Sequence, residues 1–183
     1  MRKVFYAVLP ALVMVFIISL TVRAEYKHAF VGASKCRTCH MSKKKGDQYG
    51  VWKSSKHAKA YETLLTEESK KAAEKAGHGG KAPEENPFCL KCHVTGWDAP
   101  AELLGSKYSR EEGVTCETCH GPGKDYSPIK IMRDKTAAVE NGLIFSKKED
   151  CLTCHNEESP TFKAFDYEAA WKEVAHNNPN NTQ

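Results

Sequence analysis

The pattern of apolar and polar positions divides the chain into an apolar N-terminal segment and a polar remainder. Two basic residues precede a stretch from Val4 to Val22 that is almost entirely apolar. A basic start, an apolar stretch and the small residue Ala24 are typical of a secretory signal peptide. We therefore expect residues 1–24 to be a signal peptide and residues 25–183 to form one domain. The apolar stretch is also close to membrane-spanning length, so an uncleaved anchor is the alternative.

The polar remainder carries only short helical patterns. In residues 46–65, Tyr49, Trp52, His57 and Leu64 fall on one side of a helical wheel. Further helices are expected at Thr66–Ala76, at Thr136–Asn141 before Gly142, and from Asp166 to His176. These patterns predict a mainly α fold, in which short helices are joined by long loops.

Composition changes this picture, because the remainder has too few apolar side chains for an ordinary core. Leu, Ile, Val and Phe make up about 13% of residues 25–183, below the roughly 20% at which chains tend to be disordered. Something other than side chains must therefore supply the apolar interior.

The cysteines indicate what supplies it. All eight belong to C-x-x-C pairs, and a histidine follows each pair directly. The four motifs are Cys36, Cys39 and His40; Cys89, Cys92 and His93; Cys116, Cys119 and His120; and Cys151, Cys154 and His155. A disulfide scaffold, zinc sites and a redox dithiol all use paired cysteines. The histidine in every motif favours attachment of c-type haem. In that chemistry the thiols bind the vinyl groups and the histidine is the proximal iron ligand.

The sequence thus predicts four haem c groups, with their iron, in one compact multihaem domain. Four histidines outside the motifs match the four distal positions: His57, His176, His28 and His78. His57 lies on the aromatic helix face, and we expect it to ligate the haem attached at His120. His176 is either a ligand or a helix C-cap. His28 is close to the new N-terminus and His78 lies in a glycine-rich loop, so each is a ligand or a plain surface residue.

The charge of the chain indicates no nucleic-acid partner. The net charge is +4, but it falls to +1 when residues 1–24 are removed. Eight haem propionates would bring it to about −7. The lysines are therefore expected to form a solvated surface around anionic cofactors.

Four segments extend beyond the bare motifs: VWKSSKHAKAY (Val51–Tyr61), CLKCHVTG (Cys89–Gly96), GVTCETCHGPGKDY (Gly113–Tyr126) and CLTCHNEESPTFKAFDYE (Cys151–Glu168). They resemble the cytochrome c554 family of multihaem proteins. The resemblance implies a mostly helical periplasmic electron carrier with closely stacked haem pairs, in which three haems have two histidine ligands and one is five-coordinate. It also implies His40, His93, His120 and His155 as proximal ligands and His57 as a distal one. The chain lacks a histidine between His93 and His120, where the family pattern has a distal ligand.

The leading functional hypothesis is a periplasmic electron carrier, without a catalytic residue, that works with redox partner proteins. One alternative is an enzyme that reduces a small molecule such as nitric oxide at a five-coordinate haem. A second is a membrane-anchored tetrahaem quinol dehydrogenase, which requires the apolar N-terminal stretch to be retained. The chain has no C-x-x-C-K motif, so it does not resemble the lysine-ligated nitrite reductases.

Overall fold

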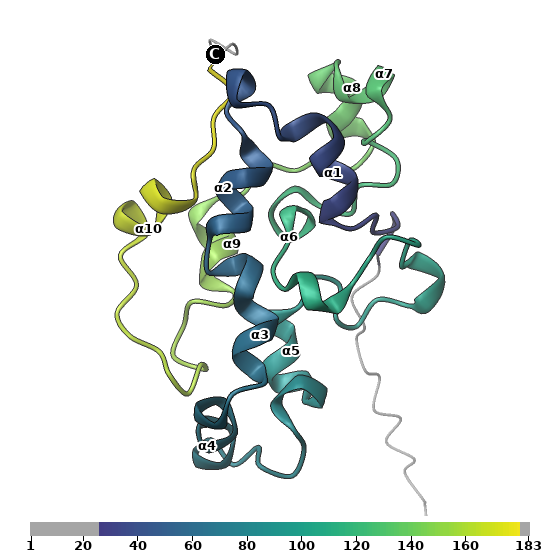
Figure 1. Cartoon of the computed structure of the whole chain (residues 1–183). Helices are drawn as coiled ribbons and strands as arrows, with labels where there is room; N and C mark the ends of the chain where they lie inside the picture. Colours follow the sequence, from purple (N-terminus) through teal and green to yellow (C-terminus); the bar gives the residue numbers. More distant parts are fainter. Residues whose placement is uncertain (1–25, 180–183) are drawn as a thin grey trace, which may run out of the picture.

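The computed structural model describes residues 26–179, and these residues form short helices joined by loops (Figure 1). The α-helices are α1 (Ala33–His40), α2 (Gln48–Ser54), α3 (Ala60–Leu64), α4 (Glu67–Lys75), α5 (Pro87–His93), α6 (Cys116–His120), α7 (Ile129–Met132), α8 (Lys135–Glu140), α9 (Lys148–Leu152) and α10 (Tyr167–Val174). Five 3₁₀ turns lie between them: η1 (Lys43–Lys45), η2 (His57–Lys59), η3 (Pro83–Glu85), η4 (Ala101–Leu103) and η5 (Arg110–Glu112). The expectation of a mainly α fold is confirmed for this part of the chain.

The helices are arranged along a central column formed by α2 and α3 (Figure 1). Helix α1 packs on α2 and also contacts α6, while α5 packs beside α3. The charged helix α4 forms one end of the molecule, and α9 and α10 lie along one side. This arrangement brings all four haem motifs around the column.

Buried side chains form two small clusters rather than one core. Trp52 packs with Ala33 and Ala58, and its indole nitrogen donates to the carbonyl oxygen of Val114 at 2.8 Å. The second cluster contains Leu64, Leu90 and Val94. Several large apolar side chains remain about half exposed, including Phe145 (50%), Ile144 (49%) and Trp171 (40%). The scarcity of apolar residues in the sequence is therefore visible as incomplete burial.

The N-terminal part of the domain is fastened by backbone pairing. Within residues 26–179 there is no strand longer than an isolated bridge, which joins Phe30 to Leu104. The Phe30 amide donates to Leu103 and its carbonyl accepts from Gly105, both at 2.8 Å. These bonds hold the segment that carries His28 against the loop before α6.

The helix expected over residues 46–65 is interrupted. It bends at Ser55, whose backbone is extended, and resumes as η2 and α3. A second segment explains the break, because the Val114 amide donates to the His57 carbonyl oxygen at 3.0 Å. Gly113 makes this approach possible: it has φ +71°, and a Cβ there would lie 2.8 Å from the His57 oxygen.

The other expected helices are present with small changes. Thr66 caps α4 through its side chain, and α8 ends just before Gly142. Asp166 caps α10 as expected, but the helix ends at Val174, so His176 lies beyond it. None of the helices in residues 26–179 is long and apolar enough to cross a membrane. The expected signal peptide lies outside the described residues.

Candidate haem-binding site

Each haem motif lies on or directly after a short helix. Helices α1, α5 and α6 end at His40, His93 and His120, and α9 is followed at once by Cys154 and His155. On a helix, residues i, i+3 and i+4 share one face. The spacing of each motif therefore directs both thiols and the imidazole toward the same side, as attachment of one haem requires. The caps are local: Asn86 accepts from the Phe88 amide, and Thr115 accepts from the Glu117 amide.

The motifs meet in pairs that do not follow their order in the sequence. The thiols of Cys36 and Cys116 are hydrogen-bonded to each other, which raises the pKa of Cys36 and lowers that of Cys116. In the same way, a hydrogen bond between Cys92 and Cys154 raises the pKa of Cys92 and lowers the pKa of Cys154 to about 6. The first motif thus lies against the third, and the second against the fourth.

The pairing of the first and third motifs is reinforced by two carboxylates, of which Glu117 is buried and Glu112 is partly exposed. Glu117, inside the third motif, is only 2% exposed. Its oxygens accept from the amides of Val31 and Gly32, both at 2.8 Å, and of Gly123 at 2.7 Å. Glu112 accepts from the Ala33 amide at 2.9 Å. Amides at the start of α1, which have no partner within the helix, are therefore satisfied by residues in or beside the third motif.

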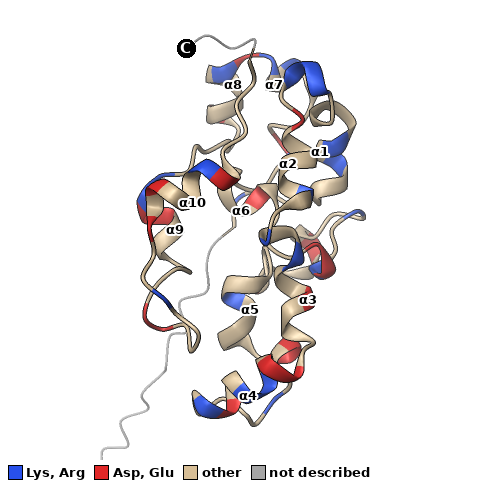
Figure 2. Cartoon of the chain, turned by 60° about the vertical axis from the view of Figure 1, so that its left-hand side comes forward, with Lys and Arg blue, Asp and Glu red and all other residues tan. Residues whose placement is uncertain are grey.

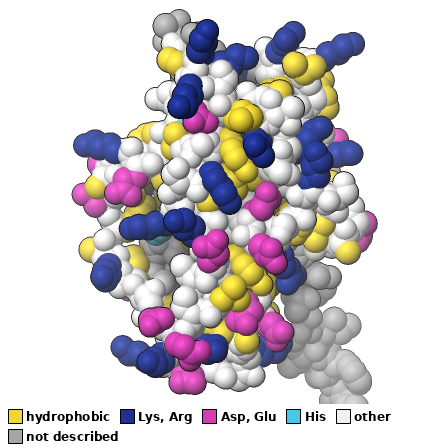
Figure 3. Space-filling model, viewed as in Figure 1, with side chains coloured by type: hydrophobic (Ala, Val, Ile, Leu, Met, Phe, Trp, Pro, Cys, Tyr) yellow, Lys and Arg dark blue, Asp and Glu magenta, His cyan; other side chains and the backbone are white. Residues whose placement is uncertain are grey.

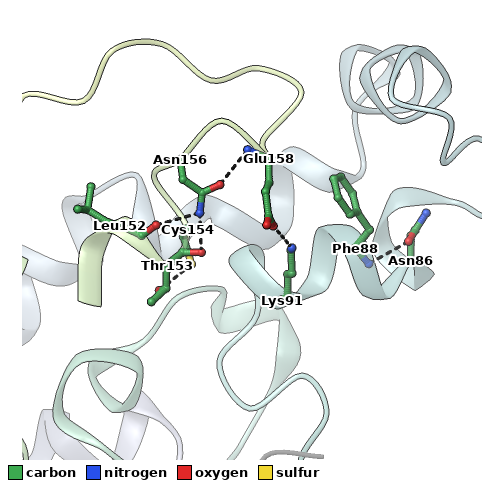
Figure 4. Close-up of polar contacts among 8 residues, drawn as sticks. All are labelled: Asn86, Phe88, Lys91, Leu152, Thr153, Cys154, Asn156 and Glu158. Carbon is green, nitrogen blue, oxygen red and sulfur yellow. Dashed lines mark hydrogen bonds and ion pairs between the residues drawn. The ribbon is translucent and has the colours of Figure 1, made fainter. Parts of the chain in front are cut away.

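The second and fourth motifs are joined by an ion pair (Figure 4). Lys91 Nζ, between the two cysteines of α5, lies 2.6 Å from Glu158 Oε2 in the loop after α9. Asn156 shapes that loop: its amide group donates to the carbonyl oxygen of Leu152 at 2.9 Å, and its side-chain oxygen accepts from the Glu158 amide at 2.9 Å. The contact brings the two helices that carry these motifs to opposite sides of one hollow.

That hollow is a cavity of about 1520 Å³, lined by side chains from the second, third and fourth motifs. Its volume exceeds the roughly 300–1,000 Å³ of sites that hold one small molecule. The lining includes Cys89, Cys92, His93, Cys119, Cys151, Cys154, His155 and His57, together with Phe162, Phe165 and Trp171. Ser55 also lines it, and its buried hydroxyl has no partner among the described residues. Such a hydroxyl would be satisfied by a polar group of whatever fills the cavity.

Two histidines outside the motifs lie opposite motif histidines. The ring centres of His57 and His155 are 6.0 Å apart, and those of His120 and His176 are also 6.0 Å apart. A metal–imidazole bond is about 2 Å long, so rings on opposite faces of one metal ion have centres about 6 Å apart. The observed spacings match that arrangement.

The structure differs from the sequence-based expectation about which motif His57 faces. We expected the haem at His120, but the ring of His57 lies against His155, and His176 is the residue beside His120. The expectation assumed one continuous helix over residues 46–65. The bend at Ser55 changes the direction of the chain just before His57, which no periodicity of the sequence reveals.

Hydrogen bonds fix the tautomer of several histidines. Nδ1 donates to a backbone carbonyl in His93 (Ala60, 2.7 Å), His120 (Ile144, 3.1 Å) and His176 (Val174, 2.7 Å). This leaves Nε2 as the free base, which is the usual arrangement in metal-ligating histidines. Burial also lowers the pKa of His57, His120 and His155, with a neighbouring histidine contributing at His57 and His120. The neutral imidazole that iron requires is therefore favoured.

The remaining two histidines occupy different surroundings. His28 Nδ1 lies 2.6 Å from Asp125 Oδ2, and its ring packs on Gly142, where a Cβ would lie 2.7 Å from His28 Cδ2. His78 stacks on Phe88 with ring centres 3.8 Å apart, and it is not among the residues that line the cavity. Ligation by His28 and His78 stays a prediction.

Sequence reasoning missed the residues that hold the motifs together. Glu117, Glu158 and Gly113 act through contacts with distant segments, and Ser55 places a buried, unpartnered hydroxyl at the cavity. Only the position of Glu117, inside a haem motif, was a signal available in the sequence. On the geometry described above, the residues fit covalently bound haem: thiols and imidazoles share a face, a large hollow separates two motifs, and neutral imidazoles stand in opposed pairs.

Comparisons with known proteins agree with this chemistry. Residues 35–121, which contain the first three motifs, match the family profile described as cytochrome c554 and c-prime. Cytochrome c-554 of Nitrosomonas europaea is 32% identical over 141 residues, covering 69% of this chain and 57% of that protein. The c-type polyheme cytochrome OmcC of Geobacter sulfurreducens is 29% identical over 94 residues, covering 49% of this chain and 12% of OmcC. No solved structure matches significantly.

The chain thus spans less than two thirds of the length of these two relatives. The profile and the relatives are all c-type cytochromes, which carry covalently bound haem c with its iron and serve in electron transfer together with redox partners. The chain belongs to the cytochrome c554 family.

Proposed function

We propose that this chain is a periplasmic electron-transfer protein in which residues 25–183 carry four haem c groups, after removal of a signal peptide at residues 1–24. Bound haem supplies one-electron cycling between Fe(III) and Fe(II). The observation that carries the proposal is the two pairs of opposed imidazoles, His57 with His155 and His120 with His176. An iron held between such a pair would have no open position for a substrate, which favours electron transfer.

The residues of the chain have distinct tasks in this proposal. The eight motif cysteines hold the four groups covalently, and His40, His93, His120 and His155 are the proximal ligands. Carbonyl oxygens of Ala60 and Ile144 orient two of these imidazoles. Around the cavity, Phe165 stacks on His155 with ring centres 4.5 Å apart, and the unpartnered hydroxyl of Ser55 would donate to a polar group of a bound haem. Because the motifs are in contact in pairs, the haems attached to each pair would lie close together.

The count of four and the cleavage site are tested by the intact mass of the mature protein. We expect the mass of residues 25–183 plus four haems. Electron paramagnetic resonance of the oxidised protein should show low-spin signals for the haems at His120 and His155. A mass with three or fewer haems after full maturation contradicts the count, and retention of Met1 in detergent-solubilised membranes supports the anchored quinol dehydrogenase instead.

A second function is favoured by the surroundings of His93. Its imidazole lines the cavity and is oriented by Ala60, but within residues 26–179 no ring contact joins it to another histidine. An iron held there with one open face would bind a small molecule such as nitric oxide. Carbon monoxide binding by the reduced, unmodified protein tests for an open iron position. Nitric oxide consumption by the reduced protein then distinguishes the enzyme from an electron carrier with one five-coordinate haem.

A further inference from the structure

Basic side chains gather at the end of the molecule that holds the first haem motif. Between Ala33 and Gly46 the chain has five basic residues and no acidic one. Four of them form what we call the basic collar: Lys35 and Arg37 on α1, and Lys43 and Lys45 on η1, all exposed. The acidic residue next in sequence, Asp47, caps α2 by accepting from the Gly50 amide. The collar therefore surrounds the motif on a helix and a turn.

The charge is distributed unevenly over the whole molecule. In both ribbon views α7 and α8 lie at the same end as α1, and α4 lies at the opposite end (Figures 1 and 2). Exposed Lys130, Arg133 and Lys135 add basic side chains over α7 and α8, where Asp134 and Glu140 are the exposed acidic residues. On the face drawn in Figure 3, blue basic side chains predominate at this end, and magenta acidic ones predominate in the lower half.

The collar is not neutralised by the ion pairs that the structure describes. Among residues 26–179 the ion pairs join His28 to Asp125, Lys70 to Glu67, and Lys91 to Glu158. None of them involves Lys35, Arg37, Lys43 or Lys45. Like charges held close together repel one another, so the collar is stabilised when an anionic surface covers it.

The first motif contains an exposed cysteine. Cys39 is exposed, whereas the other seven motif cysteines are partly covered. Met41, directly after the proximal histidine His40, is 51% exposed. A haem attached at Cys36 and Cys39 would therefore come near solvent at Cys39, beside the basic residues of the collar.

We propose that the basic collar is the docking surface for a redox partner protein with an acidic surface, so that electrons enter or leave the chain at the first motif. This rests on the proposed electron-transfer function. Complementary charge steers a partner toward one face and raises its association rate, and it does so more strongly at low salt. In this proposal the partner exchanges electrons with the first motif, at the end of the molecule that carries the collar. Electrons then pass between the first motif and the other three.

The first test uses small redox reagents of opposite charge with the holoprotein in stopped flow. Hexacyanoferrate(III), an anion, takes one electron from a reduced iron and becomes hexacyanoferrate(II), leaving that iron oxidised. At low ionic strength, K43E/K45E should slow this reaction by about tenfold and weaken its salt dependence. Hexaammineruthenium(III), a cation that takes one electron in the same way, should react faster with the same variant. The milder K43Q/K45Q should change both rates in the same directions by less.

The matched control makes the same change of charge at the other end of the molecule. K71E/K75E on α4 should leave both reaction rates within about twofold of the unmodified protein. Equal slowing of the hexacyanoferrate(III) reaction by both double variants would overturn the collar, because the effect would then follow net charge alone. A shift in the midpoint potential of one haem, with no change in salt dependence, would assign the lysines to the propionates of that haem and would also overturn the proposal.

The second test uses an acidic protein as a model partner. Reduced plant-type ferredoxin gives up one electron to an oxidised iron of the holoprotein, and K43E/K45E should slow this transfer while K71E/K75E does not. Equal rates for the unmodified protein and K43E/K45E at low salt would contradict docking at the collar. An unmodified protein that exchanges electrons with no reagent at all would instead contradict the electron-transfer function itself.

Discussion

At the scale of single residues, Glu117 shows that a residue inside a haem motif also connects separate segments of the fold. Its carboxylate is buried and accepts three backbone amides from two separate segments. Burial raises the pKa of Glu117, while the amide donors from Gly123, Val31 and Gly32 oppose that rise. The residue between two haem-binding cysteines thus fastens the N-terminal segment to α6.

Replacing Glu117 by glutamine should weaken the hydrogen bonds that connect these two segments. A glutamine side chain has one acceptor oxygen and an NH₂ group that faces an amide donor, so at least one buried amide loses its partner. We expect the free energy of unfolding to fall by about 1–3 kcal/mol. Denaturant unfolding of the holoprotein measures this change, and Glu111→Gln, at an exposed position of η5, is the control. Equal stability of the two variants would show that the bonds to Glu117 are dispensable.

The opposed histidines lead to a second prediction. His57→Ala removes the ring 6.0 Å from His155, so one haem should become high-spin and bind carbon monoxide when reduced. Thermal stability should fall as well, because a link between α9 and the central column is lost. The matched variant is His78→Ala, whose ring stacks on Phe88 but does not itself line the cavity; an unchanged spectrum in that variant would remove His78 from the ligand set. Unaltered low-spin signals in His57→Ala would remove His57 from the ligand set.

At the scale of elements, the short helices depend on contacts with distant segments. The loop after α9 is tied to α5 by the ion pair of Lys91 and Glu158 (Figure 4). The hydrogen bond and charge of Lys91 lower the pKa of Glu158, and Glu158 raises the pKa of Lys91. Both side chains have access to solvent, so the ion pair contributes little to the stability of the fold, and salt reduces that contribution further.

The ion pair makes stability depend on pH in one direction. Because the pKa of Glu158 is lower in the folded chain, its stabilising effect is complete above the unfolded glutamate pKa of about 4.3. The effect is lost as the pH falls through the folded pKa. Glu158→Gln should therefore have a slightly lower melting temperature than the unmodified protein at pH 7, and the same melting temperature at pH 3. Glu157→Gln, at the exposed neighbouring position, is the control, and a difference that persists at pH 3 or in 1 M salt would rule out the ion pair as its cause.

Some helices were predictable from the sequence, whereas the helices of the haem motifs, α1, α5, α6 and α9, were not. Capping side chains mark the starts of α4 and α10 in the sequence, at Thr66 and Asp166. The interruption at Ser55 depends on Gly113, which lies 58 residues further along. Local periodicity contains no information about such a contact. For the same reason His57 lies beside His155 rather than beside His120, where it was expected, and its ligation to a haem stays a prediction.

At the scale of the whole molecule, the polypeptide is a scaffold that is incomplete without its cofactors. Its two buried clusters are small, and large side chains such as Phe145 and Trp171 remain partly exposed. The four motifs were evident in the sequence because their residue types and spacing are local. Their pairing, first with third and second with fourth, was not, because spacing along a chain does not determine which segments meet.

The haem-free chain should therefore not fold cooperatively. The apolar area that it buries without cofactors is too small to offset the loss of chain entropy. When the protein is expressed without haem maturation, circular dichroism should show little helix and no sharp thermal transition. The matured protein, measured in the same buffer, is the control. A sharp transition in the haem-free chain would mean that the two small clusters suffice.

The alternation of the paired motifs has a consequence for how the molecule comes into being. A chain is synthesised from its N-terminus, so the first motif can pair with the third only after residue 120 has been synthesised. The second motif can pair with the fourth only after residue 155. Before residue 120 is synthesised, the first and second motifs are therefore both present on the nascent chain without their partner motifs. A truncation after residue 140 would keep both motifs of the first pair and would remove the fourth motif from the second pair. The two pairs are therefore completed at different times, although their motifs alternate along the chain.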